Sequence, residues 1–294
     1  MAEVHHFTYG AFNPIAAFLL AFVGSFFGLL STSRARDART RGRRNRWLVI
    51  AAFAIGGGAI WLMHFTAMLG FEVPASPVRF DVPVTVTSLV FAVGAVGVGL
   101  LMVGHGRRSL PKVVVAGVLT GGGVLAMHYT GMRAMHMGGE IHYNVPLVAA
   151  SVIIAVVAAT VALWFTVSVR GYLPISGAAA IMAVAVCGMH YTGMAALSVH
   201  LDPVAPPVVE GFRPLAMIVP ITLITAATII GVALSGLQAM TEEEFTDGAG
   251  SPRRGLHAEP GNAWSLKQAT AATATIAARR PSPRPVPMRT PTNG

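Results

Sequence analysis

A six-residue word occurs three times in this chain at nearly constant spacing. It reads Met-His-Tyr-Thr-Gly-Met at residues 127–132 and 189–194, and Met-His-Phe-Thr-Ala-Met at residues 63–68. The successive histidines His64, His128 and His190 are 64 and 62 residues apart. A period of this kind indicates one structural unit used three times, and it limits the possible folds more than any single segment does.

Each period contains two apolar runs close to the roughly 20 residues that a membrane-spanning helix needs. Only 11% of all residues are charged, against about a quarter in a soluble domain. The chain has no pattern of short alternating strands, so helices are the way to satisfy the backbone in lipid. We therefore expect an all-α membrane protein with seven transmembrane helices, at about residues 11–31, 47–70, 83–104, 112–137, 145–169, 174–199 and 214–240.

Three regions follow from this pattern. Residues 1–10 form a short extracytoplasmic head, and residues 11–240 form a seven-span membrane domain with three helix-hairpin repeats that each carry one motif. Residues 241–294 are rich in Pro, Arg, Ala, Thr and Gly and have no apolar periodicity. Such a composition cannot bury enough apolar surface to offset chain entropy, so we expect a disordered cytoplasmic tail.

Basic residues set the expected orientation. The connections after the first, third and fifth spans hold 11 lysines and arginines, against three on the other side. Because cytoplasmic loops carry the excess of positive charge, the N-terminus should lie outside and the C-terminus inside. We expect a multi-pass protein of the plasma (inner) membrane, in which the net charge of +9 reflects this bias and not a nucleic-acid partner.

The three motif histidines should lie at one depth. Each is 16 or 17 residues from the start of its even-numbered span, which corresponds to about 24 Å along a helix. All three even-numbered spans run in the same direction, so the histidines should form one layer in the outer part of the membrane. Ionisable residues inside a membrane are functional candidates, although a histidine there can also simply bond a neighbouring carbonyl.

Methionines accompany each histidine. Four residues after each one, on the same helix face, come Met68, Met132 and Met194. Directly before each one, about 100° round the helix, come Met63, Met127 and Met189. Imidazole with thioether suits copper, and the layer lacks the carboxylates that magnesium or calcium prefer. We predict a metal site of three histidines supported by methionines, although methionine is also a common packing residue.

Two glycine triplets, at residues 56–58 and 121–123, precede two of the motifs by about one turn. Small residues let membrane helices approach closely. We therefore expect the triplets to pack the even-numbered spans against one another.

At the motif residues the chain resembles the MHYT family of bacterial integral-membrane sensors, over about residues 11–240. The resemblance implies several spanning helices, with the Met-His-Tyr-Thr word near the outer face of alternating ones. It also implies that the motif's histidine and methionine bind copper, which would sense oxygen, carbon monoxide or nitric oxide. The residues so carried over are Met63, His64, Met127, His128, Met189 and His190, with Met68, Met132 and Met194 matching the trailing methionine. The first copy departs at Phe65 and Ala67, which bears on packing and leaves the ligands in place.

Many members of that family continue into diguanylate cyclase, phosphodiesterase or histidine kinase domains. The segment after residue 240 is too short and polar for such a domain, so we expect a stand-alone sensor that is not an enzyme. Its partners would be the lipid bilayer, a diatomic gas and a separate cytoplasmic signalling protein.

Two other functions stay open. A copper-handling or transport protein would need polar residues at several depths, and the inner halves of the spans have few. A haem-binding membrane protein would favour a second histidine layer, and only His105 is available on the inner side.

Overall fold

The computed structural model describes residues 3–201 apart from His6 and Arg108, then residues 210–214 and scattered positions up to residue 234. Within that part, six helices are long and apolar enough to cross a membrane. The expected seventh span at 214–240 lies mostly outside the described residues, and the expected tail at 241–294 lies wholly outside them. The chain is a multi-pass, helical membrane protein.

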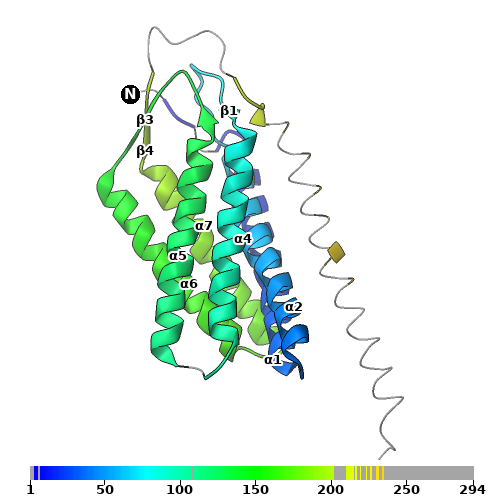
Figure 1. Cartoon of the computed structure of the whole chain (residues 1–294). Coiled ribbons are helices and arrows are strands. Elements are labelled where there is room, and N and C mark those ends of the chain that lie inside the picture. Colours follow the sequence, from blue (N-terminus) through cyan, green and yellow to red (C-terminus); the bar gives the residue numbers. More distant parts are fainter. Residues whose placement is uncertain are drawn as a thin grey trace, which may run out of the picture. The chain divides into compact units, whose positions relative to one another are not determined.

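Figure 1 shows the helices running side by side. The first, third and fourth spans are α1 (Phe12–Asp37), α4 (Val82–Gly104) and α5 (Leu110–Arg133), and the last two are α6 (Val145–Ser168) and α7 (Tyr172–Ala195). The second span, Arg41–Met68, is built from α2 (Arg41–Ala52), the π-helical segment η1 (Phe53–Leu62) and α3 (Met63–Met68).

Polar side chains fix where several helices begin. Asp81 accepts a hydrogen bond from the Val84 backbone N–H at 2.8 Å, and Asn144 accepts one from Leu147 at 3.2 Å. Both caps are followed by a proline in the first turn, where a missing N–H costs nothing. Thr40 caps α2 in the same way, through Arg43.

The second span is the centre of the bundle. Of its most apolar window, 83% is buried inside the protein, against 22–39% for the other five spans. A Cβ on Gly24 of α1 would overlap the η1 backbone, and a Cβ on Gly56 of η1 would overlap the α4 backbone at Ala92 and Val93. The second span is therefore held between α1 and α4 by close backbone contact.

The glycine triplets differ from the expectation. Gly56 lies against α4, and Gly121 lies against the α6 backbone at Ala155 and Val156. The triplets therefore pack the second span against the third and the fourth span against the fifth, and not the even-numbered spans against one another.

One end of the bundle is basic. It is formed by the α1–α2, α4–α5 and α6–α7 connections, and we call it the basic end. Apart from Arg39, the arginines expected in a loop after the first span lie in helices instead, because α1 continues to Asp37 and α2 begins at Arg41. Their side chains cover helix ends: Arg36 donates to the carbonyls of Thr166 and Val169 at the end of α6.

The opposite end carries short strands that the sequence did not predict. β1 (Arg79–Phe80) pairs antiparallel with β2 (Met135–His136), and β3 (Gly139–Tyr143) pairs antiparallel with β4 (Leu197–Leu201). The expected spans at 112–137 and 174–199 are thus too long, since residues after Arg133 and Ala195 turn into strands. We call this the motif end, because all three motifs finish here.

Candidate metal centre

The structure brings the three motif histidines into one cluster. His64 comes from α3, His128 from α5 and His190 from α7, and their exposed fractions are 0%, 0% and 1%. The Nδ1 atom of His64 lies 3.0 Å from that of His190 and 3.3 Å from that of His128. The rings are 4.9–5.3 Å apart between centroids and nearly perpendicular to one another. The predicted histidine layer is confirmed as a geometric feature.

Glycines of the motifs hold the rings in place. The α-carbon of Gly131 lies against His64, so close that a Cβ there would overlap the Nε2 atom. Gly193 lies in the same way against Nε2 of His128. Each contact joins the histidine of one motif to the fifth residue of the next motif along the chain. The sequence carried a signal for this, since the third residue after each histidine is always small: Ala67, Gly131 and Gly193.

Packing alone leaves these imidazoles poorly satisfied. A neutral imidazole has one N–H and one lone pair, so Nδ1 of His64 cannot make full hydrogen bonds to both of its neighbours. Among the described residues, the buried Nε2 atoms of His64 and His128 have no hydrogen-bond partner. A buried polar group without a partner costs about 1–3 kcal/mol. Because the pairs His64–His190 and His64–His128 both use Nδ1 of His64, one of these hydrogen bonds must stay incomplete, and a shared cation would relieve that conflict.

The spacing of the nitrogens fits a metal ion. Metal–imidazole bonds of about 2.0–2.1 Å place ligand nitrogens about 3.3–3.6 Å apart in tetrahedral or trigonal sites. The Nδ1 separations of 3.0 and 3.3 Å need little or no expansion to reach that range. A cation among the three Nδ1 atoms would use all three lone pairs at once. The Nε2 atoms of His64 and His128 would then be positioned by contact with glycine, not by the hydrogen-bonded partners usual for ligating histidines.

All six motif methionines are buried: Met63, Met68, Met127, Met132, Met189 and Met194. Met63 packs with Ala17, Ala21 and Ala183 in a small apolar cluster. Met189 lines an apolar cavity of about 70 Å³. These are the contacts of packing residues, and a ligand role for the methionines stays a prediction.

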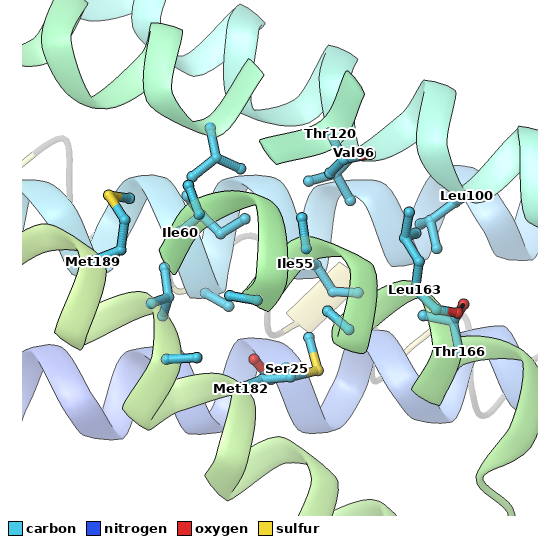
Figure 2. A pocket seen from close by; sticks show the side chains of 18 residues that line it. Ser25, Ile55, Ile60, Val96, Leu100, Thr120, Leu163, Thr166, Met182 and Met189 are labelled. Carbon is cyan, nitrogen blue, oxygen red and sulfur yellow. Dashed lines mark hydrogen bonds between the residues drawn. The ribbon is translucent and has the colours of Figure 1, made fainter. Parts of the chain in front are cut away.

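That cavity lies on the side of the cluster that faces the basic end. Figure 2 shows Met189 at one end of it and Leu163 and Thr166 at the other. Its lining is apolar except for the hydroxyls of Ser25, Thr120 and Thr166. The histidines are therefore separated from the basic end by an apolar layer.

Aromatic side chains surround the cluster. The Tyr129 hydroxyl is 2.9 Å from that of Ser151, so this tyrosine hydrogen-bonds to the neighbouring helix α6. Its ring meets Tyr143 at 5.7 Å, just outside the spans. Burial raises the pKa of Tyr143, nearby Tyr129 raises it further, and Arg133 opposes both. Phe65, at the equivalent place in the first motif, meets Trp61 at 4.8 Å.

The N-terminal segment lies over the motif end. Backbone hydrogen bonds join His5 to Glu72, and both the backbone N–H and the hydroxyl of Thr8 donate to the Gly70 carbonyl. The Phe7 ring lies 5.7 Å from the ring of Tyr191, the neighbour of His190. At the motif end, the cluster is thus covered by the N-terminal segment and the strands.

Comparison with known proteins agrees with this arrangement. Residues 57–116 and 121–179 each match the MHYT model, described as a bacterial signalling protein N-terminal repeat. The chain belongs to the MHYT family. The third motif lies beyond both matched segments, and in the structure its His190 completes the histidine cluster.

Several curated relatives are signalling proteins. The bifunctional diguanylate cyclase/cyclic di-GMP phosphodiesterase MucR of Pseudomonas aeruginosa is 34% identical over 79% of this chain and 34% of its own length. The cyclic di-GMP phosphodiesterase NbdA of the same species is 37% identical over 65% of this chain and 24% of its own length. Signaling protein YkoW of Bacillus subtilis is 29% identical, over 69% and 26%. The chain thus spans about a quarter to a third of the length of these relatives, and no solved structure matches it.

Proposed function

We propose that this MHYT protein is a sensor in the plasma (inner) membrane that holds copper at His64, His128 and His190. The motif end would face outward, and the protein would detect a diatomic gas (O₂, CO or NO) or the redox state. It would signal to the cytoplasmic side through a separate signalling protein, without catalysis of its own. When bound, copper would supply the redox change and a coordination position open to a small ligand.

One observation carries this proposal: in three buried rings, the Nδ1 atoms of His190 and His128 lie 3.0 and 3.3 Å from Nδ1 of His64. The protein positions the imidazole rings and excludes water from them. Gly131 and Gly193 fix the ring positions, and the head and strands cover the outer side. Three buried imidazoles with their Nδ1 atoms this close together form a site that favours a cation.

The same contacts give a route for the signal. His64, His128 and His190 come from three different spans, and with their rings held by the glycine contacts, a change in the Nδ1 separations would move α3, α5 and α7 relative to one another. Those spans continue to the basic end, where a cytoplasmic partner would read the movement. The relatives that act on cyclic di-GMP suggest the class of such a partner.

The structure disfavours the two alternatives. A haem would have to fit between two axial imidazoles, and here the third ring and the 4.9–5.3 Å packing leave no space for it. A transport path would continue from the cluster as polar groups, and the cavity on that side is lined by apolar side chains with three hydroxyls.

The test is the metal content of detergent-purified protein from cells supplied with copper, together with an optical spectrum. We expect near-stoichiometric copper in the wild type and its loss in the His64/His128/His190→Ala variant. His128→Asn, which keeps most of the side-chain volume, should also lose most of the copper if the triple variant fails to fold.

The matched control is His142→Ala/His200→Ala. The rings of these two exposed histidines meet edge to face, 4.7 Å between centroids, on the β3–β4 pair, where adventitious copper would bind. Copper should be unchanged in this control. Copper-free wild type that also resists loading during expression, or copper that follows the exposed pair, would refute the proposal.

A further inference from the structure

A second cavity lies at the basic end, far along the bundle from the histidines. Its volume is about 120 Å³, and it lies between α1, α2, α4 and α6. By this measure a cavity needs about 10–15 Å³ to hold one water, so there is room for a polyatomic ion. Two arginines, Arg36 and Arg44, contribute to its wall.

The two arginines differ in their contacts. Arg36 donates to the carbonyls of Thr166 and Val169, and so neutralises the end of α6. The guanidinium of Arg44 has no hydrogen bond or ion pair among the described residues, and its Nε atom is buried. A buried guanidinium donor without an acceptor is costly, which points to a ligand that supplies one.

The charge around the cavity stays positive after the helix ends are counted. The ends of α1, α4 and α6 lie at its wall, and each contributes about −0.5 charge. The three helix ends together contribute a charge of about −1.5, and Arg36, Arg44 and Lys112 contribute three positive charges. Lys112 lies close to the wall, because its ammonium donates to the His105 carbonyl beside Gly106. No acidic residue is among the described lining residues. Asp37, which follows Arg36 in the sequence, instead pairs with Arg170 at 3.2 Å.

We propose that this cavity binds a phosphate group. A guanidinium matches phosphate oxygens with its paired donors, and the phosphate charge balances the excess that the helix ends leave. Leu48, Leu100 and Val103 form an apolar part of the wall, which suits the carbon portion of a phosphate ester. The phosphate can belong to an anionic phospholipid at this membrane surface or to a soluble phosphate compound, and both present the same chemistry.

The test is thermal unfolding of the detergent-purified full chain in two titrations. One adds inorganic phosphate, and the other adds dioleoyl-phosphatidylglycerol with dioleoyl-phosphatidylcholine as its zwitterionic reference. We expect saturable stabilisation in at least one titration. A response to inorganic phosphate identifies a soluble ligand, and a response to phosphatidylglycerol alone identifies a lipid.

The deciding variant is Arg44→Gln, with Arg41→Gln as its matched control. Arg41 is exposed in the same helix turn and does not line the cavity. The apparent dissociation constant should rise at least tenfold for Arg44→Gln and stay unchanged for Arg41→Gln. Arg44→Lys, which keeps the charge and loses the paired donors, should fall between them.

Two results would overturn the proposal. One is no stabilisation of the wild type by either compound, and the other is equal stabilisation of the Arg44→Gln and Arg41→Gln proteins. Native mass spectrometry of the wild type gives an independent reading, because bound phosphate or phosphatidylglycerol should survive gentle detergent removal. Copper content has no part in these readouts, so the result stands apart from the function proposed for the histidines.

Discussion

The contact between Gly131 and His64 ties two motifs together through a single missing side chain. Gly193 makes the equivalent contact with His128, and both glycines are required by space and not by backbone angle, since both lie within regular helix. The corresponding residue of the first motif is Ala67, which is buried. The three motifs are therefore alike in sequence but not equivalent in packing.

Gly131→Ala should displace the His64 ring. The added methyl group overlaps Nε2, so we expect a loss of about 1–3 kcal/mol in unfolding free energy, as for other overpacked interiors. Copper content should fall as well, because the Nδ1 separations change with the ring. Thermal unfolding and elemental analysis on the same sample measure both effects.

Gly122→Ala is the matched control for that variant. It lies in the same helix, and an added Cβ meets nothing within 4 Å. Alanine is the better helix former, so stability should be unchanged or higher by up to about 1 kcal/mol. Equal effects of the two substitutions would mean that Gly131 does not position His64.

At the scale of the elements, the second span decides how the bundle is built. Gly24 of α1 contacts η1 backbone to backbone, and Gly56 of η1 contacts α4 in the same way. Contacts of this kind cannot relax by a rotamer change, because both surfaces are main chain. The span that carries His64 is thus held on two sides by backbone contacts that do not involve the histidine cluster.

Gly24→Ala tests that contact. The new Cβ would overlap backbone atoms of Ala54, Gly58 and Ala59, so α1 and η1 must move apart. We expect a loss of at least about 1–3 kcal/mol, read from unfolding of the purified protein in detergent. Gly94→Ala in α4, where a Cβ meets nothing within 4 Å, should be neutral or slightly stabilising.

The histidine cluster was predictable because its cause is simple. Equal distances from the starts of three parallel helices place His64, His128 and His190 at one depth, and helical rise converts count into length. The glycine contacts were only half predictable. The sequence shows that Gly56 and Gly121 permit close approach, but which helix approaches depends on the order in which the spans pack.

Two other features could not be read from the sequence. The ends of the spans near Arg133 and Ala195 looked apolar enough to continue, and the structure pairs the following residues as strands, Gly139 with Leu201 among them. The sequence could not show that α1 continues to Asp37, because arginines near a membrane surface are as compatible with a helix end as with a loop.

Over the whole membrane domain, the described part has a layered interior. The histidine cluster lies near the motif end, the apolar cavity follows, and the arginine-lined cavity lies at the basic end. The last two share Leu100 and Thr166 in their walls. Unfilled volume beside the histidine cluster gives neighbouring side chains space to repack when the helices that carry the histidines move.

Phe7→Ala should open the cover that the N-terminal segment forms over the motif end. Phe7 contacts Tyr191, and aromatic pairs contribute about 0.5–1.5 kcal/mol, which corresponds to about a two- to tenfold faster release of copper to a chelator. Release followed by absorbance of the copper–chelator complex measures this rate. Tyr9→Ala, also exposed in the head, should release copper at the wild-type rate, and a matching acceleration there would contradict a specific role for Phe7.

The burial of the second span also bears on how the protein is made. This span leaves the ribosome before α4, α5, α6 and α7, yet in the folded protein it is the most buried of the six spans described. During synthesis its glycine faces and His64 must first be compatible with lipid, which its mean hydropathy of 1.9 allows, and only later with protein. The same residues are thus exposed first to lipid and later to the neighbouring helices. The three-histidine site cannot exist until α7, the helix that supplies His190, has been inserted.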